Sequence, residues 1–184
     1  MPGKSFLSKF LKNRKLSRFF IIAVSLYTCW FMVYEFFIKY HTPVNEKLIS
    51  NLVWVSSKII SLFADQIYFS TEDLEMQMVG IDGAHPVWIG GPCNGVSIMV
   101  LFAIFIIAFP GPWKQKLWFV PSGMLVIHLI NALRIVALAF IQFYAPNYLD
   151  FNHNYTFTIL VYAIIFGFWM IWVNKFSDLH AKHE

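Results

Sequence analysis

Long apolar stretches dominate the pattern of hydrophobic and polar positions along the chain. Four of them are candidates for membrane-spanning helices: Phe19 to Ile38, Val96 to Phe109, Leu117 to Tyr144 and Tyr155 to Val173. A helix that crosses the hydrocarbon core of a bilayer needs roughly 20 residues, nearly all of them apolar. The pattern therefore predicts an all-α fold, a polytopic membrane helix bundle with about four transmembrane spans.

The stretch from Leu48 to Phe69 differs from these four. Its apolar residues recur at helical spacing, but polar residues such as Asn51, Lys58 and Asp65 interrupt them. Helices with one apolar and one polar face are typical of positions at a surface. We therefore predict an amphipathic helix that lies on the membrane surface or on the other helices.

The composition agrees with a membrane protein. Of the 184 residues, 58% are hydrophobic and only 13% are charged, and the mean hydropathy is +0.60. These values leave too few polar residues to cover the surface of a soluble domain. We therefore expect a single integral-membrane domain over residues 1–184.

The uneven distribution of charge predicts the topology. Residues 1–18 carry six basic side chains and no acidic ones, whereas five acidic residues lie between Asp65 and Pro92. Basic segments are retained on the cytoplasmic side of a membrane. With four crossings, the N-terminus and the tail 174–184 both face the cytoplasm, and the acidic loop 70–92 is extracytoplasmic.

Three chemically distinctive residues are expected at one membrane depth. Cys93 begins the second span at its outer end, and His153 directly precedes the last span. Arg134 lies 17 residues after Leu117, which is about 26 Å along a helix and close to the outer edge of the bilayer core. The convergence of a cysteine, an arginine and a histidine from three separate segments indicates a chemical site.

Each of these residues also has an ordinary interpretation. A cysteine at a helix entrance is often only a small apolar side chain, and a histidine at the interface is often a polar anchor. An arginine near the interface often extends its guanidinium to the lipid headgroups. Asn131, almost one turn before Arg134, favours instead a helix face that meets protein or water.

The residue types suit nucleophilic catalysis. The thiolate of a cysteine is the attacking species, and helix N–H groups, a guanidinium and an imidazole all favour it. Because Cys29 lies inside the first span, we expect no disulfide between it and Cys93. Beside the thiol, Asn94 is a suitable helix N-cap, and Gly95 is expected to leave space for a substrate backbone.

Two other polar residues and one alternating stretch have expected structural roles. Glu35 can pair with Lys39 one helical turn later or with Arg134, and the first pairing is favoured. His128 is expected to be a buried, hydrogen-bonded side chain rather than a proton relay. The alternating residues of "PVWIGG", which follow a turn-like stretch, predict a short strand packed over the site.

Two questions about the histidines stay open from the residues alone. Either Asp82 or Asp150 can orient His153, in the way that a third group orients the base of a catalytic triad. His85 can be combined with Cys93 and His153 as a set of metal ligands, but their spacing matches no zinc pattern. We therefore expect no metal site.

Three short motifs carry a resemblance to a known family. "PCNGV", "NALRIV" and "NHNYTF" surround Cys93, Arg134 and His153, in that order along the chain. Together they resemble the motifs of the exosortase/archaeosortase family of membrane-embedded cysteine transpeptidases. The resemblance covers residues 90–173, and the short chain is similar to a compact, XrtF-like branch of the family.

The resemblance implies a role for each residue of the motifs. Cys93 would be the nucleophile, His153 the general base and later the general acid, and Arg134 the group that stabilises a thiolate or an oxyanion. The supporting residues would be Asn94, Gly95 and Asn131. The catalytic core would then extend over residues 93–173.

The resemblance also implies a place and partners. The protein would be a multi-pass protein of the bacterial cytoplasmic (inner) membrane, with its active site at the extracytoplasmic face. Its substrate proteins would carry a C-terminal motif, a transmembrane helix and a basic cluster, and their acyl group would pass to an acceptor on a lipid or glycan. No cofactor and no nucleic acid is implied. The alternative is a non-enzymatic membrane scaffold or small transporter subunit.

Overall fold

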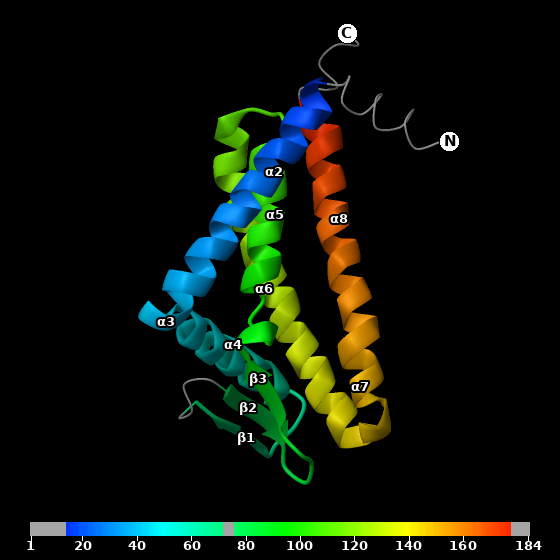
Figure 1. Ribbon diagram of the computed structural model, residues 1–184. Coiled ribbons are helices and arrows are strands. Elements are labelled where there is room, and N and C mark those ends of the chain that lie inside the picture. Colours follow the sequence, from blue (N-terminus) through cyan, green and yellow to red (C-terminus); the bar gives the residue numbers. More distant parts are fainter. Residues whose placement is uncertain (1–13, 72–75, 178–184) are drawn as a thin grey trace, which may run out of the picture.

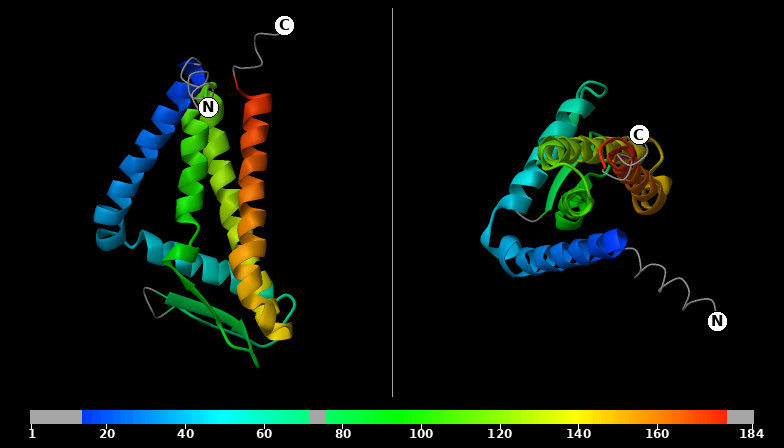
Figure 2. Two further views of the ribbon diagram at one scale, coloured as in Figure 1. Left: turned by 45° about the vertical axis from the view of Figure 1, so that its right-hand side comes forward. Right: turned by 90° about the horizontal axis from the view of Figure 1, so that it is seen from above.

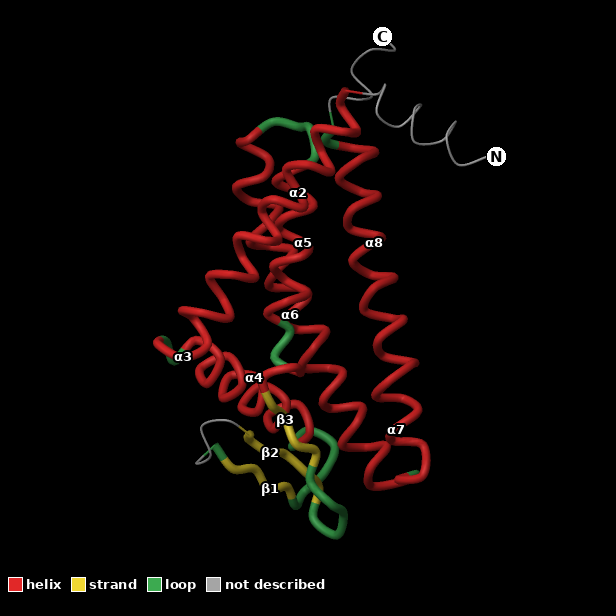
Figure 3. The backbone as a smooth tube through the Cα atoms, in the orientation of Figure 1, coloured by secondary structure: helices red, strands yellow, loops and turns green. Residues whose placement is uncertain are grey.

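The computed structural model describes residues 14–71 and 76–177 (Figure 1). The first 13 residues of the basic N-terminus and the tail from residue 178 lie outside the described residues, and so does the segment 72–75 of the acidic loop. Within the described ranges, both chain ends lie at one end of a helical bundle, and a small sheet lies at the other (Figures 1 and 3). The predicted helical membrane bundle is confirmed.

The bundle is built from long apolar helices that run side by side (Figures 1 and 2). They are α2 (Arg14–Val33), which continues through the π-helical turn η1 (Tyr34–Ile38) into α3 (Lys39–His41), α5 (Val96–Ala108), α6 (Trp113–Tyr144) and α8 (Phe157–Lys175). Phe102, Phe119 and Trp172 form the centre of their shared core. The Cβ of an alanine at Gly123 would collide with the Phe102 ring, so a glycine lets this ring of α5 pack directly against the backbone of α6.

The predicted number of four spans is corrected by the length of α5. Within the described residues, three helical segments are long and apolar enough to cross a membrane: Ser17–Ile38, Trp113–Tyr144 and Pro146–Lys175. Helix α5 has only 13 residues, which corresponds to about 20 Å. Gly95, with φ of +79°, precedes its first turn, and the extended backbone of Phe109 ends its last. The apolar run was predicted correctly, but these two breaks keep the helix shorter than a bilayer core.

The single amphipathic helix predicted for residues 48–69 is only half right. Helix α4 begins earlier and covers Val44–Ile60. The chain then forms the strand β1 (Ile67–Ser70), because its β-branched and aromatic residues pair with β2 (Met76–Ile81) and suit a sheet. The strand predicted in "PVWIGG" is confirmed as β3 (Val87–Gly90).

The three strands form an antiparallel sheet in the order β1-β2-β3. One face of the sheet packs against α4 and the C-terminal half of α6, where Leu52, Val79, Ile89 and Ala132 form a second core. Helix α6 therefore contributes to both cores of the molecule. Its buried residues, such as Ile127 in the first core and Ala132 in the second, hold the helix in place and make it a rigid base for a site.

Lys116 closes the other end of α5. Its side chain is only 5% exposed, and its ammonium donates hydrogen bonds to the carbonyl oxygens of Ile107 (2.8 Å) and Phe109 (2.6 Å). It also lies 4.9 Å from the centre of the Trp113 ring. The last carbonyl groups of a helix lack partners within the helix, and a cation at this end also complements the helix dipole.

Replacing Lys116 by methionine is expected to lower the stability of the protein by about 2 kcal/mol, because the carbonyl groups of Ile107 and Phe109 lose a charged donor. The measurement is the midpoint of thermal unfolding of the purified protein in detergent. Lys114→Met is the matched control, since the Lys114 side chain is exposed. Equal midpoints for the two variants would show that the capping bonds contribute nothing.

Candidate active site

Cys93 lies in a short turn between the sheet and the bundle. It is the last residue of the 3-10 helix η2 (Gly91–Cys93), which joins β3 to α5. The Asn94 side-chain oxygen accepts a hydrogen bond of 2.9 Å from the N–H of Val96, the first residue of α5. The predicted N-cap is corrected: Gly95 occupies that position, and Asn94 bonds the first N–H of the helix from one residue earlier.

The space beside Gly95 is filled by protein. A Cβ added to this glycine would lie 3.1 Å from Nδ2 of Asn131, so the expected opening for a substrate backbone is corrected. The φ of +79° is a second reason for glycine here. Gly95 thus allows α6 to approach the cysteine turn closely.

Asn131 holds the turn against α6. Its Nδ2 donates a hydrogen bond of 2.8 Å to the carbonyl oxygen of Cys93, and its side chain is 6% exposed. An amide that bonds a backbone carbonyl in a buried place fixes the backbone of the nucleophile rather than its sulfur. The predicted supporting residue is therefore in direct contact with the turn.

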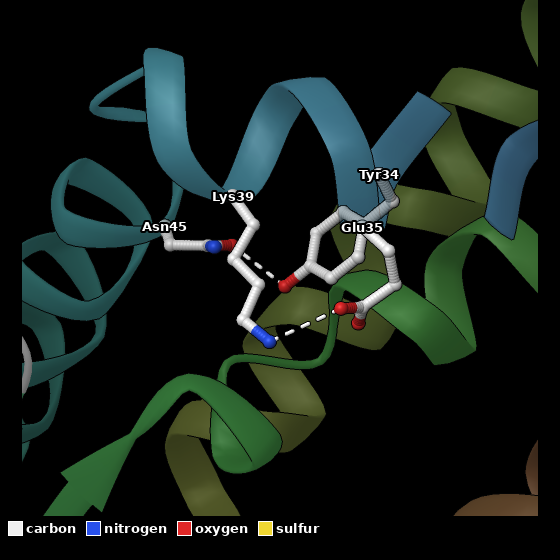
Figure 4. Close-up of polar contacts among 4 residues, drawn as sticks. All are labelled: Tyr34, Glu35, Lys39 and Asn45. Carbon is white, nitrogen blue, oxygen red and sulfur yellow. Dashed lines mark hydrogen bonds and ion pairs between the residues drawn. The ribbon is translucent and has the colours of Figure 1, made fainter. Parts of the chain in front are cut away.

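A second set of hydrogen bonds fixes the turn from the opposite side. Nδ2 of Asn94 donates to Oδ1 of Asn45 at the start of α4 (2.9 Å), and the Tyr34 hydroxyl donates to the same oxygen (3.2 Å). Figure 4 shows the bond between Tyr34 and Asn45. It also shows the ion pair of Glu35 with Lys39, 3.1 Å long, which confirms the pairing favoured above.

His153 reaches the cysteine from a third segment. It lies in the π-helical turn η4 (Asn152–Thr156), between the short helix α7 (Leu149–Phe151) and α8. Its Nε2 is 3.7 Å from Sγ of Cys93, so residues 60 positions apart in the chain are in hydrogen-bonding contact. π-Helical turns are frequent at functional sites because they re-aim side chains within a helix.

Asn154 is a partner of the histidine that the sequence did not single out. Its Oδ1 lies 3.3 Å from Nδ1 of His153. A proton on Nδ1 that is donated to this oxygen leaves Nε2 as an acceptor for the Cys93 thiol. Within the described residues, neither Asp82 nor Asp150 is bonded to His153, so neither of the two predicted candidates has this role here. An asparagine next to a histidine in "NHN" was the available signal.

Arg134 binds the backbone of the histidine. Its Nη2 donates to the carbonyl oxygen of His153 (3.3 Å), and its Nε is buried without a hydrogen-bond partner among the described residues. Arg134, Cys93, Asn131 and His153 line one cavity of about 20 Å³, which is room for about one water molecule. A cationic donor with unused bonding capacity therefore lies at the same cavity as the thiol.

Two further histidines lie outside this cavity. His85 lines a different cavity, and the described residues contain no group of three metal-ligating side chains. Nε2 of His128 lies 2.8 Å from Oδ1 of Asn51 in α4, which confirms the predicted hydrogen bond, but the side chain is only partly buried, so the predicted burial is corrected. Both cysteines are free thiols, as expected.

The site therefore has the composition of a thiol-dependent catalytic centre in a membrane protein, with a thiol, an imidazole and a guanidinium at one cavity. The model of the family described as transmembrane exosortase (Exosortase_EpsH) matches residues 10–174 of the 184-residue chain. The chain belongs to this family, whose members are in general membrane protein-sorting transpeptidases of the cysteine type. No curated protein and no solved structure matches the chain.

Asn131→Asp is expected to slow alkylation of Cys93 by iodoacetamide about tenfold, because a carboxylate cannot donate to the Cys93 carbonyl and repels it. The rate is measured in a Cys29→Ser background, so that Cys93 is the single thiol. Asn147→Asp, at an exposed position of the turn η3 (Pro146–Tyr148), is the control. An unchanged rate in Asn131→Asp would contradict a positioning role for this residue.

Proposed function

We propose that the protein is a membrane-embedded cysteine transpeptidase that cleaves a C-terminal sorting signal from membrane-anchored proteins and transfers them to an acceptor. The observation that carries this proposal is the contact of 3.7 Å between Sγ of Cys93 and Nε2 of His153. Membership of the transmembrane exosortase family supports the same reaction. The branch that we propose within this family is the compact, XrtF-like one.

The first chemical step forms a thioester. The Cys93 thiol transfers its proton to Nε2 of His153, and the sulfur attacks the carbonyl carbon of the scissile peptide bond. The tetrahedral intermediate then expels the amine of the C-terminal segment, which takes the proton from the imidazolium. The acyl group of the substrate protein is left on Cys93, and the leaving segment keeps its membrane helix.

The second step releases the acyl group. An amine or hydroxyl of the acceptor attacks the thioester carbonyl, His153 takes the proton of the acceptor, and the sulfur leaves as a thiol once this proton returns to it. Arg134 is proposed to stabilise the charge on sulfur or oxygen, because it lines the cavity and its Nε has no partner among the described residues. The N–H of Val96 is already used by Asn94, so a guanidinium is the better donor for an oxyanion.

The proposed location is the extracytoplasmic side of the bacterial cytoplasmic membrane. The site lies on the part of the bundle next to the sheet, away from the described chain ends at Arg14 and Ser177 (Figure 1). Basic residues are concentrated in the N-terminal segment and hold it in the cytoplasm. The opposite end of the bundle, with the sheet, is therefore assigned to the outside.

Cys93→Ala is expected to abolish processing of a membrane-anchored reporter that ends in a short motif, a transmembrane helix and a basic cluster, because no other described thiol lies at the site. Processing is followed as a shift in reporter mass in cells that produce the enzyme variant at the normal level. Cys29→Ser is the matched control and should process the reporter normally. Continued processing by Cys93→Ala would exclude the proposed mechanism.

His153→Ala and Arg134→Ala are each expected to slow alkylation of Cys93 by at least about tenfold near neutral pH, since the thiolate loses its base or its cation. Unchanged alkylation rates would contradict the activation of the thiol.

A small charged methanethiosulfonate that does not cross membranes should modify Cys93 in intact spheroplasts and leave Cys29 unmodified. Modification of Cys93 from the cytoplasmic side only would contradict the assigned topology.

A further inference from the structure

We propose that the free edge of strand β3 binds the substrate as an added strand, with an extended peptide running parallel to β3 and ending at Cys93. This inference rests on the proposed function, which requires a peptide at the thiol. It identifies the part of the protein that holds the residues preceding the scissile bond. It also predicts that main-chain hydrogen bonds, rather than side-chain fit alone, position these residues.

The first observation is the place of β3 in the sheet. In the order β1-β2-β3, this strand pairs with β2 on one side and has no strand neighbour on the other within the described residues. An edge strand directs half of its N–H and C=O groups away from the sheet, where another chain can pair with them. Since β3 ends at Gly90 and Cys93 follows in the turn η2, its edge leads to the nucleophile.

The second observation is the position of the Cys93 cavity relative to β3. Val87 and Ile89 are buried against the second core, whereas Trp88 is 52% exposed on the opposite face of the strand. Successive side chains of a strand point to opposite faces, yet all three residues line the cavity that contains Cys93 and His153. A cavity reached from both faces of a strand lies at its edge, so the reactive groups stand beside the unpaired edge of β3.

The third observation is a second cavity, which lies further along α6 and next to the turn between β2 and β3. Leu138 of α6 lines the first cavity, and Gln142, one helical turn further on, lines the second. On the opposite wall, Val87 of β3 lines the first cavity, and Asp82 and His85, which lie between β2 and β3, line the second. The two cavities, together called the groove, therefore follow one another between α6 and the segment from Asp82 to Ile89.

The two ends of this groove differ in size. The second cavity has a volume of about 530 Å³, compared with about 20 Å³ beside the thiol. Burial and the nearby Asp82 carboxylate raise the pKa of Tyr68, and its protonated hydroxyl donates to the carbonyl oxygen of Ala84 (2.6 Å). This bond fixes the turn that forms one wall. The larger cavity is suited to side chains several residues upstream of the cut.

The direction of the peptide follows from the membrane. Strand β3 runs from the outer turn toward Cys93 and the bundle (Figure 1). A substrate with its folded part outside and its C-terminal helix in the bilayer runs the same way, so the added strand is parallel to β3. The four residues of β3 extend over about 13 Å, which corresponds to about four peptide residues between the larger cavity and the scissile bond.

The experiment uses alanine-based peptidyl vinyl sulfones of one to six residues, whose electrophile takes the place of the scissile carbonyl. Cys93 adds to the vinyl carbon, and the rate constant of alkylation is measured with the full chain carrying Cys29→Ser. The rate constant is expected to rise at least about tenfold from one residue to four and then to level off. Methylation of one backbone nitrogen should lower it about fivefold at every second residue and leave it almost unchanged at the residues between.

Two controls test the groove and the reagent separately. His85→Ala and Gln142→Ala should slow only the peptides of four or more residues, by about threefold to tenfold, and leave methyl vinyl sulfone unaffected. His41→Ala, at an exposed position of α3, should change neither rate. Rates that do not depend on peptide length, or N-methyl effects that do not alternate, would overturn the added strand.

Failure of this inference is distinguishable from failure of the proposed function. Methyl vinyl sulfone has no peptide part, so its reaction reports only how reactive Cys93 is. If His153→Ala leaves the rate with this small reagent unchanged, the proposed catalytic function fails. If His153→Ala slows the small reagent and the longer peptides show no advantage, the catalytic function stands and the binding mode at β3 is wrong.

Discussion

The hydrogen bond from Asn131 to the carbonyl oxygen of Cys93 connects the two halves of this molecule. One half is the apolar bundle, and the other is the sheet with α4; the chain passes between them through the cysteine turn. A buried hydrogen bond contributes about 1 kcal/mol, but leaving its carbonyl without a donor costs more. The close approach of α6 at Gly95, which has no Cβ, makes this bond possible. The position of the thiol therefore depends on α6 rather than on its own helix.

The same helix also places the histidine. Arg134 follows Asn131 by three residues, so both side chains lie on one face of α6, and Arg134 donates to the backbone of His153. The π-helical turn around His153 directs Nε2 toward the sulfur, and Asn154 engages the opposite ring nitrogen. A thiol and an imidazole from distant segments are thus aligned against one rigid element. Such pre-organisation is what a thiol needs to react as a thiolate near neutral pH.

Several features could be predicted because they depend on local properties of the chain. The apolar runs, the ion pair of Glu35 with Lys39, the strand in "PVWIGG" and the common level of Cys93, Arg134 and His153 in the bundle all follow from spacing along a helix or strand. The prediction failed where long-range packing decided the outcome. Ile67–Ser70 forms a strand because β2 lies beside it, and the helix periodicity of the preceding residues gave no sign of this. The short α5 likewise depends on a turn fixed by α4 and α6.

The sequence by itself determined the class of protein and indicated the three residues that meet at the candidate site, since hydrophobicity and helical rise are properties of single segments. Only the tertiary structure decided that Cys93 and His153 are in contact, that Asn131 fills the space beside Gly95, and that Asn154 rather than Asp82 or Asp150 adjoins the imidazole. Residues at one level of the bundle share only one coordinate, their position along its long axis. The other two depend on how helices pack around their cores, and that packing is set by residues far apart in the chain.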